Sequence, residues 1–278
     1  MNTLGIDIGG TKIYVARYNE QLKMEAETIV PTEANKTKKH TLSNLLKAIN
    51  TVRNTETTSI GVAWAGFVDV KKGQIIKAPN VPHLDGFNLC SYIKDQTGLK
   101  TIIENDARAF AYGSRAELAP NSKMCLCIII GTGVGSGLIY NGSLIYGAHG
   151  FVGEIGHITR QNKELEAWLA GPDLKTFLSL PVDIQFSSIL PAQKKVLLQK
   201  LATPLDVFTD WLSGLVLTFD PDQIILGGGT ARYFWQHFET EIMQATQAKL
   251  KGYPNTFKLS FYNGNNAGAT GVAALSTI

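Results

Sequence analysis

The stretch Leu4-Gly5-Ile6-Asp7-Ile8-Gly9-Gly10-Thr11-Lys12 decides the fold, because an apolar run that carries one carboxylate ends in two glycines. The apolar residues predict a short buried strand. Burying the Asp7 carboxylate costs free energy unless it is hydrogen-bonded, ion-paired or bound to a metal. Glycines let backbone N–H groups approach an anion closely. The stretch therefore has two interpretations, a phosphate loop with a metal-positioning acid or a tight turn with a solvated Asp.

The residues after the glycines separate this loop from two other phosphate-binding loops. In a Walker A loop or a dinucleotide fingerprint, the glycine turn opens a helix whose N-terminus holds the phosphate. Here residues 12–18, Lys-Ile-Tyr-Val-Ala-Arg-Tyr, are rich in β-branched and aromatic residues with near-alternating polarity. That pattern favours a second strand, so the loop is predicted to be a β-hairpin turn.

The composition is that of an ordinary globular protein: 278 residues, 44% hydrophobic, with a net charge of +3. Cys125 and Cys127 have the spacing of one strand face, and buried thiols are expected rather than a disulfide framework or a zinc finger. The cluster Lys36-Thr37-Lys38-Lys39 is interpreted as a solvated loop. Without a signal peptide or a membrane-length apolar run, we expect a cytoplasmic protein with no membrane or nucleic-acid partner.

A second strand, glycine loop and strand occur in the middle of the chain. Apolar residues 124–130 precede the loop Gly131-Thr132-Gly133-Val134-Gly135-Ser136-Gly137, and Leu138-Ile139-Tyr140 follows it. This repetition predicts two similar α/β halves, each contributing a hairpin loop to one cleft. We expect an N-terminal domain of residues 1–117, to which the helix of residues 267–278 returns, and a larger C-terminal domain of residues 118–266.

Two acids and an amide follow another predicted strand, residues 100–103. Glu104-Asn105-Asp106 lies at its C-terminal end, before a predicted helix over residues 107–118. Ligands of open α/β sheets bind at the C-terminal ends of strands. The alternative is that Asp106 is a plain N-cap, since Asn and Asp are favoured there.

The last third of the sequence predicts two long helices around one strand. Thr203 is a predicted N-cap with Pro204 at the first helical position. Residues 223–226 form a buried strand that runs into Gly227-Gly228-Gly229, and a long helix is predicted over residues 230–251.

Four motifs resemble, in order and spacing, those of the ROK family of sugar kinases and sugar-responsive repressors. They are Asp7 to Lys12, Glu104 to Ala107, the glycine loop from Gly131, and Gly153-Glu154-Ile155-Gly156-His157. The resemblance spans nearly the whole chain, because residues 226–229 also look like the family's late glycine strand. It implies an α/β, two-domain actin-like/hexokinase-like ATPase fold with ribonuclease H-like halves, and it implies ATP and Mg²⁺. The implied reaction is phosphorylation of a hexose or its N-acetyl derivative.

The resemblance assigns roles position by position, with Asp106 as the catalytic base. The implied ATP contacts are Gly9, Gly10, Thr11, Lys12, Gly131, Thr132 and Gly133 at the phosphates, Gly227 and Gly228 near the adenosine, and Asp7 as a ligand of Mg²⁺ through water. The implied sugar contacts are Gly66, Asn80, Asn105, Asp106, Glu154, His157 and Glu166.

The chain departs from the family pattern at two places. Most members carry a Cys-x-Cys-Gly-x-x-Gly-Cys-x-Glu zinc motif soon after the histidine, whereas this chain has no cysteine after Cys127. A thiolate zinc site needs such ligands, so we expect no structural zinc. Ala65 stands where the family usually has proline before Gly66.

The sequence hypothesis is transfer of the γ-phosphate of ATP to the 6-hydroxyl of glucose, with N-acetylmannosamine, N-acetylglucosamine and fructose as further substrates to consider. A repressor would carry a helix-turn-helix ahead of the first glycine loop, and only six residues precede Asp7. A non-catalytic sugar sensor is the other alternative, and the acids at both strand ends favour the enzyme. The family also suggests a homodimer.

Overall fold

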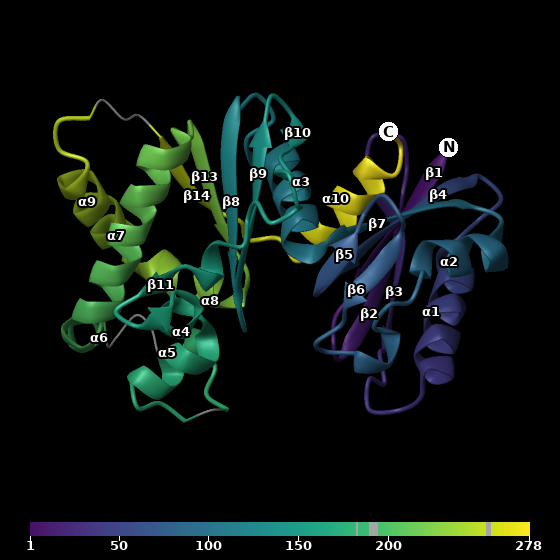
Figure 1. The fold of residues 1–278 in the computed structure, drawn as a ribbon, viewed down its shortest axis with the longest axis horizontal. Helices are drawn as coiled ribbons and strands as arrows, with labels where there is room; N and C mark the ends of the chain where they lie inside the picture. The colour runs from purple at the N-terminus through teal and green to yellow at the C-terminus, as the bar shows by residue number, and fades with distance from the viewer. Residues whose placement is uncertain (182, 189–193, 254–256) are drawn as a thin grey trace. The chain divides into compact units, whose positions relative to one another are not determined.

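The computed structural model describes residues 1–181, 183–188, 194–253 and 257–278. Its contacts divide the chain into two compact units (Figure 1), unit 1 of residues 1–116 with 265–278 and unit 2 of residues 117–264. Each unit is built on a five-stranded sheet. Within the described residues no helix has the length and apolar content to span a bilayer.

The sheet of unit 1 has the strand order β3-β2-β1-β4-β7. Its strands are β1 (Asn2–Ile8), β2 (Lys12–Tyr18), β3 (Met24–Pro31), β4 (Thr57–Trp64) and β7 (Lys100–Asn105). The first three strands form an antiparallel meander, while β4 is parallel to β1 and β7 is parallel to β4. The C-terminal ends of β1, β4 and β7 therefore meet at one edge of the sheet.

The helices of unit 1 cover both faces of this sheet. Four helices, one 3₁₀ turn and a hairpin complete the unit: α1 (Lys38–Val52), α2 (Leu89–Thr97), α3 (Asp106–Leu118), α10 (Ala267–Leu275), η1 (Pro82–Leu84), β5 (Phe67–Asp69) and β6 (Gln74–Lys77). Leu45 and Ile49 of α1 pack with Leu4 and Ile6 of β1 in one apolar core. Alternate residues of a strand face opposite sides, so Gly5 and Asp7 face the side that carries α10.

Helix α10 packs so closely on the sheet that the backbones of the helix and the strands touch. A methyl group added to Gly5 of β1 would overlap the carbonyl oxygen of Ala269, and one added to Gly61 of β4 would overlap that of Val272. Gly113 of α3 is in the same position against Ala267. No side chain fits between such surfaces, so glycine is required at these positions by close approach.

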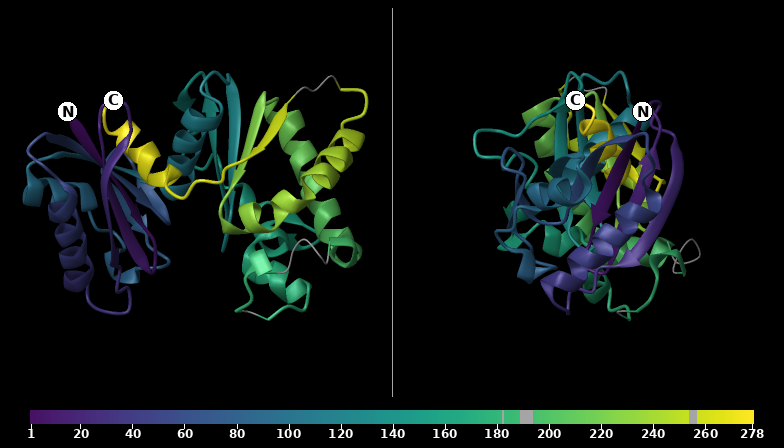
Figure 2. Two further views of the ribbon diagram at one scale, coloured as in Figure 1. Left: turned by 180° about the vertical axis from the view of Figure 1, so that it is seen from behind. Right: turned by 90° about the vertical axis from the view of Figure 1, so that its right-hand side faces the viewer.

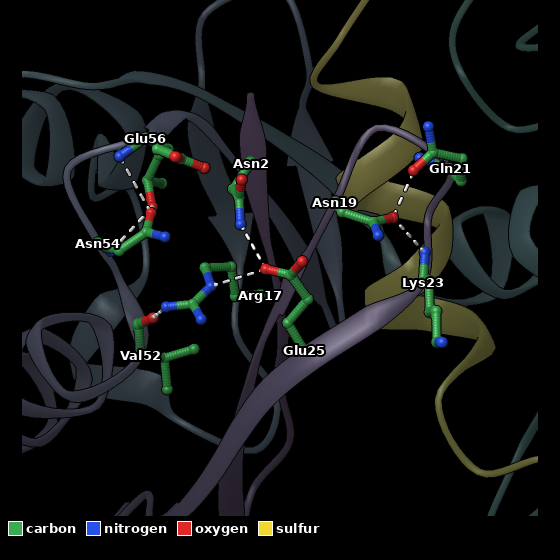
Figure 3. Close-up of polar contacts among 10 residues, drawn as sticks. Asn2, Arg17, Asn19, Gln21, Lys23, Glu25, Val52, Asn54 and Glu56 are labelled. Atoms are coloured by element: carbon green, nitrogen blue, oxygen red, sulfur yellow. Dashed lines mark hydrogen bonds and ion pairs between the residues drawn. The ribbon is translucent and has the colours of Figure 1, made fainter.

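A polar network ties the C-terminal end of α1 to the sheet, as Figure 3 shows. Arg17 of β2 donates from Nη1 to the carbonyl oxygen of Val52 over 2.8 Å and from Nε to Glu25 Oε2 over 3.4 Å. The same Glu25 oxygen accepts from Asn2 Nδ2 over 2.6 Å. Arg17 thus satisfies a carbonyl that the end of a helix leaves without an intrahelical partner.

The sheet of unit 2 has the order β10-β9-β8-β13-β14. Its strands are β8 (Met124–Ile130), β9 (Val134–Tyr140), β10 (Ser143–Leu144), β13 (Gln223–Gly227) and β14 (Lys258–Phe261). As in unit 1, three antiparallel neighbours are followed by two parallel ones. The shared topology confirms the predicted repetition of strand, glycine loop and strand.

Short helices and turns surround the sheet of unit 2, and α7 and α9 pack side by side against it (Figure 2). The helices are α4 (Glu166–Leu169), α5 (Gly171–Phe177), α6 (Lys194–Lys200), α7 (Ala202–Phe219), α8 (Gly229–Tyr233) and α9 (Glu239–Lys249). The 3₁₀ turns are η2 (Ile155–His157), η3 (Phe186–Ser188) and η4 (Trp235–Phe238), and a small hairpin joins β11 (Thr159–Arg160) to β12 (Lys163–Glu164).

Two predicted helices differ from the structure. The prediction of a single helix over residues 230–251 is wrong. The chain leaves helical geometry at Phe234, with φ −126° and ψ −66°, and the region forms α8, η4 and α9 instead. Phe234, Trp235 and Phe238 are fully buried, and the Trp235 indole donates to the carbonyl oxygen of Leu169 over 3.2 Å. These tertiary contacts override helix propensity.

Helix α7 begins earlier than predicted, at Ala202, with Leu201 as its N-cap residue. Thr203 is therefore not the N-cap, and Pro204 is the third helical residue rather than the first. Proline is tolerated there because N–H groups of the first turn have no intrahelical partner.

Replacing Gly61 with alanine should lower the free energy of unfolding by about 3 kcal/mol, because the new methyl group meets the backbone of α10 and neither element can yield freely. Urea unfolding followed by circular dichroism measures it. Gly214→Ala is the matched control: Gly214 is exposed within α7 with open space beside it, and alanine there should stabilise by about 0.5–1 kcal/mol. Equal unfolding midpoints for the two variants would contradict the close docking of α10.

Candidate functional site

The turn between β1 and β2 is a tight hairpin, as predicted. The Gly9 N–H donates to the Lys12 carbonyl oxygen over 3.0 Å. Thr32 holds the turn from β3's end, because its hydroxyl donates to the Gly9 carbonyl over 2.7 Å and its N–H to the Thr11 carbonyl over 2.9 Å. Asn80, a predicted sugar contact, lies against this loop: a methyl group on Gly10 would be 2.9 Å from Asn80 Cβ.

Asp7 is half-buried on the α10 side of β1. Among the described residues no donor hydrogen bonds its carboxylate, and burial raises its pKa while the charge of Lys12 opposes that shift. A carboxylate in this state suits a hard cation such as Mg²⁺, which keeps several waters and needs only one or two protein carboxylates. The described residues contain no group of three or more His, Cys, Asp or Glu side chains that could hold a metal ion.

The turn from β7 into α3 orients Asn105 and Asp106. Asn105 is the residue that caps the helix, since its Oδ1 accepts from the N–H of Ala107 over 3.0 Å and of Arg108 over 3.1 Å. Asp106 is the first residue of α3, and its Oδ1 accepts from Ala107 N over 2.9 Å and from Asn105 Nδ2 over 3.1 Å. Asp106 is therefore not a plain N-cap; Asn105 caps the helix and also orients the Asp106 carboxylate.

Gly66 joins this turn from the end of β4. Asn105 Nδ2 donates to the Gly66 carbonyl oxygen over 3.2 Å. Gly66 has φ +143°, and a methyl group there would overlap the Lys77 carbonyl oxygen, so only glycine fits this approach. In unit 1 the structure thus groups Gly66, Asn105 and Asp106, and it places Asn80 against the β1–β2 turn.

A buried ion pair supports the turn from beneath. Arg108 Nε donates to Glu104 Oε1 over 2.7 Å, and the two side chains are only 5% and 2% exposed. The same Glu104 oxygen accepts from the Asn105 N–H over 2.7 Å. Arg108 was not among the site residues predicted from the sequence.

The glycine loop of unit 2 is a second tight hairpin with its own anchors. The Gly131 N–H donates to the Gly133 carbonyl over 2.9 Å. The Gly131 carbonyl accepts from Gly171 N over 2.8 Å and from the Thr230 hydroxyl over 2.9 Å. These contacts tie the loop to the first turns of α5 and α8, and neither anchor was predicted from the sequence. Gly228, a predicted adenosine-side contact with φ +86°, also adjoins this loop. A methyl group added to Gly228 would lie 2.6 Å from the Ile130 carbonyl oxygen.

The side chain of Glu166, the first residue of α4, contacts the glycine loop. Its Oε2 accepts from the Val134 N–H over 2.8 Å, and a methyl group on Gly133 would come within 2.7 Å of that oxygen. The family resemblance implied a sugar contact for Glu166. In the structure one of its oxygens holds the predicted phosphate loop, and among the described residues none donates to the other.

The Gly153–His157 turn packs on the strand that leaves the same loop. Ser136 Oγ donates to the Gly153 carbonyl over 2.9 Å, and a methyl group on Gly156 would overlap the Val134 carbonyl oxygen. His157 Nδ1 lies 3.0 Å from Glu164 Oε2, and His157 Nε2 lies 3.8 Å from Glu154 Oε2. The pKa of His157 is raised, chiefly by the Glu164 hydrogen bond, against an opposing effect of burial. Glu164 was not among the site residues predicted from the sequence.

The model of the ROK family matches residues 3–168, which is more than half of the chain. An N-acetylmannosamine kinase of Citrobacter koseri is 37% identical over 160 residues, a match that covers 56% of this chain and 54% of that protein. The chain therefore spans about half the length of the curated relatives it matches.

Two solved structures are similar over the whole chain. A ROK hexokinase of Thermus thermophilus has a TM-score of 0.80 at 25% identity and covers 100% of this chain and 98% of its own. A ROK family glucokinase of Streptomyces griseus, solved with glucose and AMPPNP, has a TM-score of 0.75 at 25% identity, with coverage of 100% and 99%. These similarities confirm the predicted actin-like/hexokinase-like fold.

Arg108→Met should lower the free energy of unfolding by about 3–5 kcal/mol, because it removes the guanidinium group that contacts the buried Glu104 carboxylate. Thermal and urea unfolding measure the loss. Lys36→Met is the control, since it removes the cation of an exposed pair with Glu33 and should cost at most about 1 kcal/mol. Losses of similar size in the two variants would show that the Glu104–Arg108 pair does not support the turn.

Proposed function

The chain belongs to the ROK family, and on that basis we propose that it is an ATP-dependent sugar kinase that transfers the γ-phosphate of ATP to a hexose hydroxyl. The observation that carries the proposal is the Asp106 carboxylate at the start of α3, held by the Asn105 side chain and a backbone N–H. The matched residues 3–168 include this turn, both glycine hairpins and the Gly153–His157 turn.

Asp106 is proposed as the general base that accepts the proton of the sugar hydroxyl. A base in this role must be held in hydrogen-bond reach of the hydroxyl and in a fixed orientation. Two hydrogen bonds to Oδ1 fix the carboxylate, and the buried Glu104–Arg108 pair fixes the backbone that carries it. The pattern suits phosphoryl transfer, in which the protein mainly positions reactants and stabilises charge.

The two glycine hairpins are proposed as phosphate contacts. Gly9, Gly10, Thr11 and Lys12 supply backbone donors and a cation from unit 1, and Gly131, Thr132 and Gly133 supply backbone donors and an exposed hydroxyl from unit 2. Gly227 and Gly228 are proposed on the adenosine side. Bound Mg²⁺ would neutralise phosphate charge, and Asp7 would hold that ion through water.

The sugar contacts are proposed to be Gly66, Asn80, Asn105, Glu154 and His157. Glu166 is proposed to serve the loop with one carboxylate oxygen and the sugar with the other. Glucose is the first proposed substrate, supported by the similarity to a glucokinase solved with glucose. N-acetylmannosamine is the second, supported by the relative at 37% identity.

Asp106→Asn should lower kcat by about two to four orders of magnitude, because asparagine cannot accept the hydroxyl proton. Asparagine retains an oxygen for the Ala107 N–H, so the sugar Kd should stay within about threefold. Coupled ADP release and calorimetry measure the two quantities. Asp95→Asn, at an exposed aspartate of α2, is the matched control and should retain full activity.

A substrate panel of glucose, N-acetylmannosamine, N-acetylglucosamine and fructose is run in the same assay. We expect one hexose to raise ADP release well above the rate with ATP alone. If no sugar does so while a sugar still binds, the chain is a sensor and not a kinase. Unchanged kcat in Asp106→Asn would remove Asp106 from the base role.

A further inference from the structure

The segment after His157 is a well-defined hairpin. Residues Thr159–Arg160 of β11 pair with Lys163–Glu164 of β12, with Thr159 directly opposite Glu164. Gln161 and Asn162 connect them with φ of +52° and +62°, the two positive values of a type I′ turn. The Leu165 N–H donates to the Ile158 carbonyl over 3.0 Å and closes the base.

Contacts with α4 and α7 fix this hairpin in place. The Trp168 indole donates to the Arg160 carbonyl over 3.3 Å, and Lys163 Nζ lies 5.0 Å from the centre of the Trp168 ring. Arg160 also forms an ion pair with Asp210 of α7. The hairpin therefore fixes the position of Glu164 next to the His157 ring.

The His157 ring is surrounded by three acids from three elements. Glu154 precedes η2, Glu164 ends β12 and Glu166 begins α4, and the charges of all three favour the protonated ring. Glu164 is the nearest, with its Oε2 3.0 Å from Nδ1. Since a carboxylate only accepts hydrogen bonds, Nδ1 carries a proton and donates to Glu164.

The other ring nitrogen, Nε2, faces Glu154 at a distance that leaves room for one bridging atom. Nε2 and Glu154 Oε2 are 3.8 Å apart, too far for a direct hydrogen bond. One oxygen atom placed about 2.8 Å from both would complete the geometry. A sugar hydroxyl matches it, because it accepts from a protonated Nε2 and donates its own proton to Glu154.

We propose that Glu164 is a positioning residue that holds His157 as an imidazolium, so that Nε2 and Glu154 together bind one hydroxyl of the sugar. This inference rests on the proposed function, since it assigns His157 and Glu154 to sugar binding. It adds a residue outside the Gly153–His157 motif and predicts a pH dependence of sugar affinity.

The direction of that dependence follows from the charges. The raised pKa of His157 keeps the imidazolium present to higher pH than an isolated histidine, and sugar affinity falls as the pH rises through that pKa. Removing the Glu164 charge lowers the pKa of His157, so affinity is lost at lower pH. The variant and the parent then differ most above neutral pH and least in mild acid.

The test measures glucose and N-acetylmannosamine binding by calorimetry from pH 5.5 to 8.5 in the full chain, Glu164→Gln and Thr159→Ala. Glu164→Gln should raise the Kd of the bound sugar about fivefold near pH 8 and less than twofold near pH 6. An effect of this size is expected for a partly exposed ion pair. Thr159→Ala, opposite Glu164 on the same hairpin, should match the parent. NMR titration of the His157 ring should show a lower pKa in Glu164→Gln.

The outcomes separate this inference from the proposed function. The role of Glu164 is overturned if the pH profile of sugar Kd in Glu164→Gln overlays that of the parent, or if the His157 pKa is unchanged. Either result leaves the proposed kinase function unaffected. An equal loss of affinity at every pH would indicate a merely structural role and also overturns it. If the parent binds neither sugar at any pH, both the sugar-binding role of His157 and this inference fail.

Discussion

The buried ion pair between Glu104 and Arg108 is the interaction on which the candidate site depends. Glu104 Oε1 receives both the Arg108 side chain and the Asn105 N–H, so one carboxylate oxygen fixes the last residue of β7 and the first turn of α3. That arrangement leaves the Asn105 side chain to cap α3, contact the Gly66 carbonyl and orient Asp106. A charge pair with little exposure is costly to bury, and its hydrogen bonds offset that cost.

The two units use the same hairpin with different supports. In unit 1, the Gly9–Lys12 turn is held by Thr32 from the neighbouring strand. In unit 2, the Gly131 loop is held by Gly171, Thr230 and Glu166, which come from three helices. The support of the second loop thus depends on α4, α5 and α8, and α4 directly follows the hairpin that carries Glu164. In unit 2, the proposed sugar contacts and two of the three loop supports, Glu166 and Gly171, therefore come from one continuous segment, residues 153–171.

The sequence predicted the features that local pattern specifies. Polarity alternation after Gly10 identified a hairpin rather than a helix, and the order of the motifs identified the fold. Interactions between distant residues were beyond such patterns: nothing local to Glu166 indicates that its carboxylate binds Val134 N, or that Glu164 binds His157. The helix predicted over residues 230–251 failed for the same reason, because burial of Phe234 and Trp235 is decided by the core and not by neighbouring residues. The roles of the site residues stay predictions.

The central claim is phosphoryl transfer from ATP to a sugar oxygen, and product analysis tests it most directly. The chain is incubated with Mg²⁺, the hexose that it binds and ATP whose γ-phosphate carries ¹⁸O at its non-bridging oxygens, and the products are identified by ³¹P NMR and mass spectrometry. We predict a hexose phosphate that carries all three labelled oxygens and an unlabelled bridging oxygen from the sugar hydroxyl. Label found only in inorganic phosphate, or label retained in ATP, would contradict the account.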